Sequence, residues 1–138
     1  MALVKPAVLI VDDDPDDLVA LKATLDPLGL DVVMADCGED ALKSILDRDV
    51  AAVIRDLVMP RMNGFEIVTL IRQRERCRDL PVLILSGFDE DGARAMPGYR
   101  PGAFEFIHKP VAPETLRARV AACAARFRPE AEETQRSA

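Results

Sequence analysis

Acids, a hydroxyl and an ammonium group each lie close behind a short apolar run in this chain. The runs span residues 7–11, 51–54, 82–85 and 104–107, and the polar residues that follow them are Asp12, Asp13, Asp56, Ser86 and Lys109. Apolar runs of this length predict buried parallel strands. Because the carboxyl ends of parallel strands share the edge of a sheet at which open α/β folds bind ligands, we expect these side chains to converge.

A cluster of this kind is suited to phosphoryl transfer. Carboxylates about 4 Å apart repel one another by roughly 4 kcal/mol at an effective dielectric constant of about 20, so the cluster favours a counter-ion. Hard oxygen ligands that leave room for water and phosphate oxygens favour Mg²⁺. The ammonium of Lys109 and the hydroxyl of Ser86 could hold phosphoryl oxygens. The residues therefore indicate transfer of a phosphoryl group onto a carboxylate.

The elements that must position these residues alternate along the chain. A further strand-like run spans residues 32–35, and apolar residues at helical spacing mark helices that begin near residues 15, 41, 64 and 113. Five buried strands alternating with helices predict an α/β fold, a doubly wound five-stranded parallel sheet with helices on both faces. We expect one domain over residues 1–128 and a polar C-terminal tail over residues 129–138.

The segment between the fourth and fifth strands does not fit this alternation easily. It contains five residues that break helices within eleven positions: Gly92, Pro97, Gly98, Pro101 and Gly102. We therefore expect the fourth helix to be short or irregular, about a turn or two near residues 90–96, with an irregular loop after it.

Composition argues against several classes of partner. The chain has 138 residues and a formal net charge of -6, so it lacks the basic surface that direct binding of nucleic acid needs. No apolar run approaches the length that spans a membrane, and no cleavable targeting pattern opens the chain. The three cysteines are widely spaced and lack metal-ligand spacing, which favours a reducing, cytoplasmic setting.

Four motifs, in the order VLIVDDD, RDLVMPRMNG, PVLILSG and FIHKP, resemble the receiver domain of bacterial two-component response regulators. The chemotaxis response regulator belongs to this family, and the resemblance extends over about residues 4–127. It implies a flavodoxin-like sheet with strand order 2-1-3-4-5. It also implies a protein that catalyses only its own phosphorylation and dephosphorylation, and is not otherwise an enzyme.

The resemblance assigns a role to each residue of the cluster. Asp56 would accept a phosphoryl group from the phosphohistidine of a sensor histidine kinase or a phosphotransfer protein. The change would then pass to a downstream protein target, with the receiver as a monomer or weak dimer. Because residues 92–102 replace much of the fourth helix, part of the family's usual output face, we expect an altered partner surface. The remaining roles implied are Mg²⁺ binding by Asp12, Asp13, Asp56 and the Val58 carbonyl, phosphoryl contacts by Lys109 and Ser86, and switching by Ser86 and Phe106.

Several positions depart from the family pattern or stand beside the motifs. Arg55 replaces an apolar or small residue, and strand alternation should point it away from Asp56. We interpret it as a structural side chain that keeps its charged end in water. Val58 and Phe88 are apolar where the family often has polar groups beside the attacking water, which predicts slow loss of the phosphoryl group. His108, the sole histidine, is expected to point away from the site.

Two other functions are compatible with the same residues. An Mg²⁺-dependent phosphatase of the haloacid dehalogenase type would use the D-x-D within residues 12–14, the strand before Ser86, and Lys109. Against it, no acidic pair follows Lys109 at a strand end, and no cap insertion is present. A receiver could also act as a phosphorylation-independent adaptor, although the complete set of acids, hydroxyl and lysine favours phosphorylation.

Overall fold

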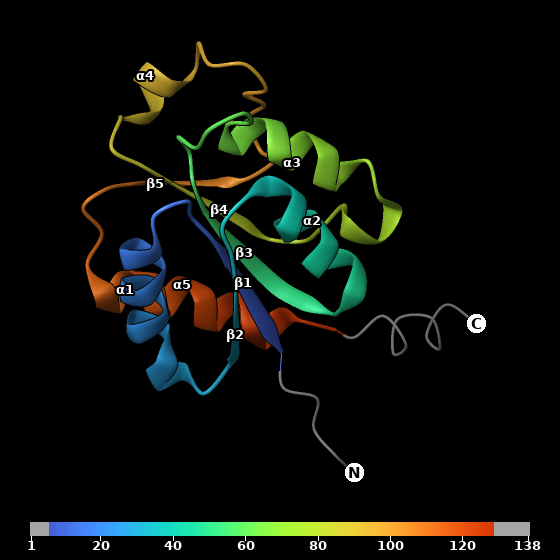
Figure 1. Ribbon diagram of the computed structural model, residues 1–138, viewed down its shortest axis with the longest axis vertical. Helices are drawn as coiled ribbons and strands as arrows, with labels where there is room; N and C mark the ends of the chain where they lie inside the picture. The colour runs from blue at the N-terminus through green and yellow to red at the C-terminus, as the bar shows by residue number, and fades with distance from the viewer. Residues whose placement is uncertain (1–5, 129–138) are drawn as a thin grey trace.

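The computed structural model describes residues 6–128. Its centre is a sheet of five parallel strands in the order β2-β1-β3-β4-β5, with helices on both faces (Figure 1). This confirms the predicted α/β class, the doubly wound parallel sheet and the strand order. The strands are β1 (Ala7–Val11), β2 (Asp31–Ala35), β3 (Val50–Asp56), β4 (Val82–Ser86) and β5 (Glu105–His108).

Local sequence sets where the helices begin and end. Before the first helix, the Asp14 carboxylate accepts a hydrogen bond from the N–H of Asp16, and Pro15 occupies the first turn. Gly29 ends the following short 3₁₀ turn with a φ of 71°, a left-handed conformation that glycine adopts readily. The helices are α1 (Pro15–Leu25), α2 (Gly38–Asp47), α3 (Gly64–Arg72), α4 (Glu90–Ala93) and α5 (Pro113–Arg126), with 3₁₀ turns η1 (Asp26–Leu28) and η2 (Glu75–Cys77).

Side chains alternate along the strands and so build a core on each face of the sheet. Val8 and Ile10 of β1 face the core that α1 and α5 cover, whereas Leu9 and Val11 face the core that α2 and α3 cover. Every residue of β1 and β4 is buried. Because both faces are covered, polar groups become accessible where the strands end.

The fourth helix is short, as predicted: α4 is a single turn of four residues. Residues 97–104 lie between this turn and β5 and are called the 97–104 segment below. It packs against α3, where the ring of Phe65 contacts those of Tyr99 and Phe104 at centroid distances of 5.2 and 4.7 Å. In Figure 1 this yellow-to-orange segment passes over the start of α3 before it enters β5. The irregular loop expected here is therefore held by side-chain packing.

The C-terminal tail and the predicted lack of a membrane-spanning segment complete the comparison with the sequence. The polar tail predicted over residues 129–138 lies outside the described residues. Within residues 6–128, no helix combines the length and the apolar character that crossing a membrane would require.

Candidate functional site

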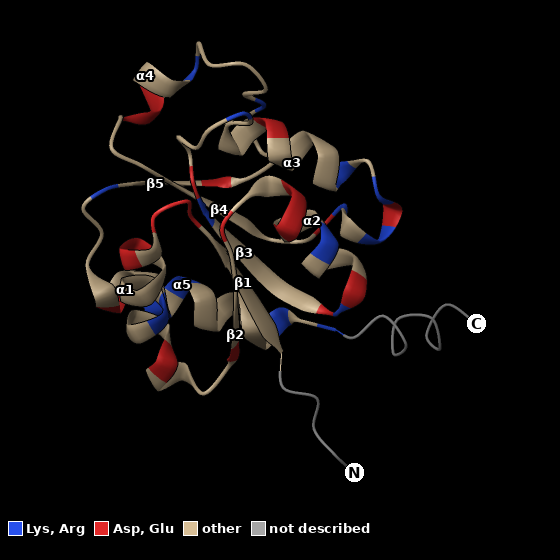
Figure 2. Cartoon of the chain, in the orientation of Figure 1, with Lys and Arg blue, Asp and Glu red and all other residues tan. Residues whose placement is uncertain are grey.

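β1 and β3 place Asp12 and Asp56 beside each other at the carboxyl edge of the sheet. Val11 pairs with Arg55 in the parallel register of these strands, so the next residue along each is one of the two acids. Asp13 follows in the stretch that joins β1 to α1, drawn red in Figure 2 because it is acidic. The register thus brings Asp12 and Asp56 together at the edge where α/β folds bind ligands.

β4 and β5 bring the hydroxyl and the ammonium group to the same edge. Asp56 pairs with Leu85, so Ser86 extends one residue beyond the end of β3. The backbone N–H of Lys109 donates to the carbonyl of Ser86 at 2.7 Å, which fixes the lysine next to the serine. The peptide bond between Lys109 and Pro110 is cis.

Lys109 and Asp56 are in direct contact. The Lys109 Nζ donates a hydrogen bond to Oδ2 of Asp56, while Oδ1 accepts one from the N–H of Val58 at 3.0 Å. The Asp56 side chain is 16% exposed and that of Lys109 is 38% exposed, so both groups can be reached from solvent. The contact places a positive charge where the oxygens of a phosphoryl group on Asp56 would lie.

Asp12 is the most buried carboxylate of the cluster, at 5% exposed. Burial raises the pKa of Asp12 from 3.8 to about 6, and the charges of Asp17 and Asp56 add to the rise. A hydrogen bond with Asp13 acts in the same direction, whereas the bond that Asp12 accepts from the N–H of Asp14 lowers the pKa. A cation bound next to Asp12 would strongly stabilise the ionised form of its carboxylate.

The donor set at this edge fits Mg²⁺ in chemical type, since carboxylates and a main-chain carbonyl are hard oxygen ligands. The cluster is not tight, because Asp12, Asp13 and Asp56 are not all within 4.8 Å of one another through their oxygens. Lys109 is the cation in contact with Asp56 here. Within residues 6–128, the three candidate ligands that do lie within 4.8 Å of one another are Asp36, Cys37 and Asp40, a separate group after β2.

Ser86 and Phe106, the predicted switch residues, lie on neighbouring strands. Ser86 is 1% exposed, and its Oγ accepts a hydrogen bond from the N–H of Phe88 at 2.9 Å. Phe106 is partly buried against the core on the α3 side. Val58 and Phe88 are 56% and 53% exposed, so the rim around the carboxylate carries two apolar side chains.

That His108 points away from the site stays a prediction, and its side chain makes a contact with the loop after β4. Its Nε2 lies 3.1 Å from the carbonyl oxygen of Gly87 and forms a hydrogen bond with it. Alternation along β5 puts His108 on the same face as Phe106, and the loop after Ser86 passes this face. His108 therefore contacts the loop beside the site, although the residue is exposed.

The interpretation of Arg55 as a side chain with its charge in water is wrong. Arg55 is 1% exposed, and its guanidinium donates to the carbonyls of Asn63 (2.9 Å) and Met62 and to the sulfur of Met59 (3.2 Å). The loop after β3 folds back over the side chain and supplies the acceptors that water would otherwise supply. Burial lowers the pKa of Arg55 to about 10, and the charge of Asp56 opposes this, so the group stays charged at neutral pH.

Sequence reasoning missed Asn63. Its Oδ1 accepts from the N–H of Glu66 at 2.9 Å, and the Glu66 carboxylate accepts from the N–H of Asn63 at 3.0 Å, which is a capping box at the start of α3. Asparagine three residues before glutamate, ahead of an apolar run, is a readable signal for this cap. The amide of Asn63 also donates to the carbonyl of Pro97 at 3.0 Å, a contact across 34 positions for which the sequence has no local signal.

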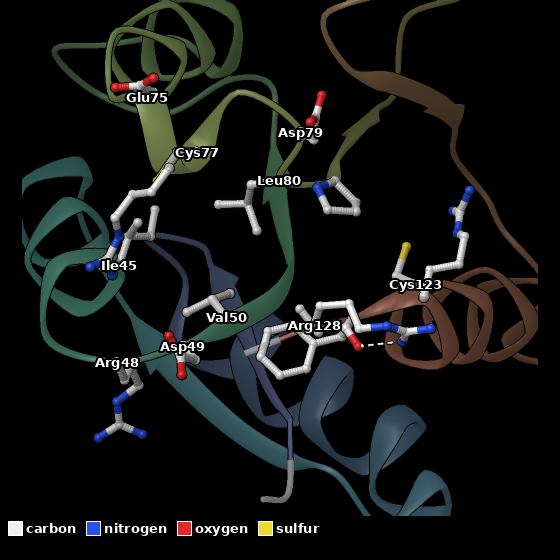
Figure 3. A pocket seen from close by; sticks show the side chains of 15 residues that line it. Ile45, Arg48, Asp49, Val50, Glu75, Cys77, Asp79, Leu80, Cys123 and Arg128 are labelled. Carbon is white, nitrogen blue, oxygen red and sulfur yellow. Dashed lines mark hydrogen bonds between the residues drawn. The ribbon is translucent and has the colours of Figure 1, made fainter. Parts of the chain in front are cut away.

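A cavity of about 430 Å³ lies at the opposite, amino edge of the sheet (Figure 3). Its lining includes Val50 at the start of β3, Leu80 just before β4, and Cys123 near the end of α5. None of the predicted site residues lines it. The clustered polar groups therefore lie at the carboxyl edge and not in this cavity.

Comparison with known proteins identifies the class. Residues 8–121 match the family described as "Response regulator receiver domain". Protein PilH of Pseudomonas aeruginosa is 33% identical over 109 residues, which cover 79% of this chain and 89% of PilH. The alkaline phosphatase synthesis transcriptional regulatory protein PhoP of Bacillus subtilis is 31% identical over 115 residues, which cover 83% of this chain and 47% of PhoP. The chain thus spans most of PilH but only about half the length of PhoP.

Solved structures agree with this match. The chemotaxis response regulator CheY4 of Vibrio cholerae has a TM-score of 0.75 and 29% identity, covering 87% of this chain and 99% of CheY4. The beryllofluoride-activated DrrB receiver domain has a TM-score of 0.74 and 28% identity, covering 89% of this chain and 100% of DrrB. This chain belongs to the receiver domain family of two-component response regulators. The resemblance of the four motifs is therefore confirmed, and the comparisons give no support to a haloacid dehalogenase-type phosphatase.

Proposed function

We propose that this protein is a phosphorylation-activated switch in which Asp56 accepts a phosphoryl group from a phosphohistidine. The donor would be a sensor histidine kinase or a phosphotransfer protein. The observation that supports this most is the contact of the Lys109 ammonium with the Asp56 carboxylate at the accessible edge of a receiver fold.

The chemistry follows from the groups at this edge. A carboxylate oxygen of Asp56 attacks phosphorus, the new P–O bond forms as the P–N bond to histidine breaks, and the departing imidazole nitrogen takes up a proton from water. Charge builds on the phosphoryl oxygens in the loose transition state. The Lys109 ammonium and the Ser86 hydroxyl would stabilise this charge by donating to two of these oxygens.

Asp12, Asp13, Asp56 and the Val58 carbonyl are the residues that would hold Mg²⁺. Once bound, the ion neutralises charge on the carboxylates and the phosphoryl oxygens. The raised pKa of the buried Asp12 supports this assignment, because it shows that the folded protein disfavours an unpaired negative charge at this position.

The response to phosphorylation would begin at the loop after β4. The phosphoryl group brings about 1.5 to 2 negative charges, by analogy with other phosphorylated residues. The Ser86 hydroxyl would donate to it, and because its Oγ also accepts from the N–H of Phe88, a shift of this side chain would move the Ser86–Phe88 loop. Phe106 would then turn inward. Nearly complete switching from a mostly inactive state requires about 5.5 kcal/mol of preference for the active form.

Labelling with a small phosphodonor tests the acceptor. Wild type and Asp56→Asn are incubated with acetyl phosphate and Mg²⁺, and bound phosphoryl is read from the mass of the intact protein. Asp36→Asn is the matched control, because Asp36 follows β2 at the same sheet edge but lies outside the proposed site. We expect labelling of the wild type and the control only. Persistent labelling of Asp56→Asn would rule out Asp56 as the acceptor.

The partners are proposed on the same basis. The phosphoryl donor would be a histidine kinase or phosphotransfer protein in the cytoplasm, and the change would pass to a downstream protein target. The family's usual output face includes the region that α4 and the 97–104 segment occupy here, so we propose that the target contacts an altered surface. A monomer or weak dimer fits this proposal, and a symmetric activated dimer packed on residues 90–127 would contradict it.

A further inference from the structure

The loop between β3 and α3, residues 57–63, starts at the proposed phosphorylation site. The N–H of Val58 donates to Oδ1 of Asp56 at 3.0 Å. The N–H of Gly64 donates to the carbonyl of Leu57 at 2.8 Å, which closes the base of the loop. A change at the Asp56 carboxylate therefore acts directly on this loop.

Arg55 fixes the far end of the same loop. Its buried guanidinium donates to the carbonyls of Met62 and Asn63, and Met59 accepts its third hydrogen bond. Moving the loop away would leave a buried charge without acceptors, which is costly. Arg55, next to Asp56 in the chain, and the end of the loop must therefore move as one unit.

Asn63 connects this unit to the 97–104 segment. Its amide donates to the carbonyl of Pro97 at 3.0 Å. Gly98 has a φ of 86° and lies so close to the start of α3 that an added Cβ would be 3.0 Å from its backbone. At the other end of α3, Arg72 donates to the Ala103 carbonyl at 2.7 Å. The segment is thus attached to both ends of α3.

We propose that the β3–α3 loop transmits the phosphorylation state of Asp56 to the 97–104 segment, with Arg55 and Asn63 as positioning residues. This inference rests on the proposed phosphorylation of Asp56. The competing route runs through the loop after Ser86 to α4, where the Glu90 carboxylate accepts a hydrogen bond from the Tyr99 hydroxyl at 2.7 Å. Both routes end at the same segment, and the two hydrogen bonds that complete them can be removed separately.

Tyr99 provides a label-free readout. It is the only tyrosine of the chain, which has no tryptophan, so tyrosine emission comes from the 97–104 segment alone. Its ring contacts Phe65 on α3 at 5.2 Å between centroids. Beryllofluoride with Mg²⁺ serves as the phosphoryl mimic. Its binding is followed by fluorine NMR, and the fractional change in Tyr99 emission is recorded on the same samples.

Two matched variants separate the routes. Asn63→Ser keeps a neutral helix cap for α3, since serine caps as well as asparagine, but the shorter side chain cannot reach Pro97. Glu90→Ala removes the hydrogen bond from Tyr99 on the competing route and leaves α3 intact. Arg55→Lys keeps the charge but replaces a planar fork, which spans two carbonyls, with a compact ammonium.

We expect all proteins to bind beryllofluoride. Asn63→Ser should lose more than half of the wild-type change in Tyr99 emission because it removes the contact of the proposed route with Pro97, and Arg55→Lys should also reduce the change. Glu90→Ala should keep most of the fractional change. The opposite pattern, with the change intact in Asn63→Ser and lost in Glu90→Ala, would overturn the inference.

Failure of the inference and failure of the proposed function give different results. Binding of beryllofluoride to the wild type without any change in Tyr99 emission would overturn the inference alone. Absence of binding in the fluorine spectrum would overturn the proposed function and the inference with it. Should Arg55→Lys not fold, Asn63→Ser still decides between the two routes.

Discussion

Replacing Asp12 with asparagine should stabilise the metal-free protein at neutral pH. Asp12 is 5% exposed, and its pKa in the folded protein is about 6 against an ordinary value of 3.8. That gap corresponds to about 3 kcal/mol by which the ionised carboxylate opposes folding. Asparagine keeps an oxygen that can accept the bond from the N–H of Asp14 and carries no charge.

The stabilisation by Asp12→Asn should depend on pH in a defined direction. Below about pH 4, Asp12 is protonated in both the folded and the unfolded protein, so its burial costs no charge and the wild type has its full stability. As pH rises from about 4 to 6, the folded state holds more protons at this position than the unfolded state, so the wild type loses stability. The difference between variant and wild type should therefore grow from near zero to about 3 kcal/mol across this window.

Urea unfolding of both proteins in a chelating buffer, at about pH 4 and about pH 7.5, measures this difference. Mg²⁺ added at the higher pH should stabilise the wild type and have little effect on Asp12→Asn, since binding to the folded state alone adds stability. Equal differences at the two pH values would refute the role of ionisation. A variant less stable than the wild type at about pH 7.5 without metal would refute the burial argument itself.

Three further changes test other parts of the structure. Val58→Asn adds a polar group on the rim and should speed loss of the phosphoryl group several-fold, followed by intact mass after removal of acetyl phosphate; an unchanged or slower rate would contradict the predicted effect of the apolar rim. Lys109→Gln removes the charge that contacts Asp56 and should slow labelling by about 100-fold, with labelling at the wild-type rate counting against its role. Gly98→Ala should lower the free energy of unfolding by about 1–2 kcal/mol because the left-handed φ and the nearby backbone oppose a Cβ. Both variants are unfolded in urea, and Gly87→Ala is the control because its Cβ would meet nothing within 4 Å. An equal loss of stability in Gly87→Ala would show that steric conflict is not the cause at Gly98.

The sheet was predictable because its signals are local. The run of residues 7–11 is bounded by Pro6 and Asp12, and β1 spans the same five residues. β3 extends beyond the predicted run at both ends, from Val50 to Asp56, and at its carboxyl end Arg55 continues the strand with its charge buried. Burial of arginine is rare, so the apolar pattern alone ended the strand too early.

The convergence at the carboxyl edge was also predictable, since it follows from parallel topology. What the sequence could not reveal are contacts between distant segments. The hydrogen bonds of Arg55 to Met62 and Asn63 depend on how the loop folds back, and that of Asn63 to Pro97 depends on where the 97–104 segment packs. The glycines and prolines of residues 92–102 indicated that α4 would be short. They did not indicate which surface the following residues would cover.

The two charged side chains buried at this edge connect stability to function. Asp12 and Arg55 lie at the ends of neighbouring strands, and burial shifts the pKa of each toward its neutral form. A buried charged side chain is unfavourable because the protein interior favours apolar groups, and such residues are found where a function requires them. For Asp12 that requirement is the proposed metal ion. For Arg55 it cannot be metal binding or contact with phosphate, because its guanidinium is enclosed by the carbonyls of the loop. Its hydrogen bonds hold the conformation of the loop, which is the role that the proposed transmission through the β3–α3 loop requires of Arg55.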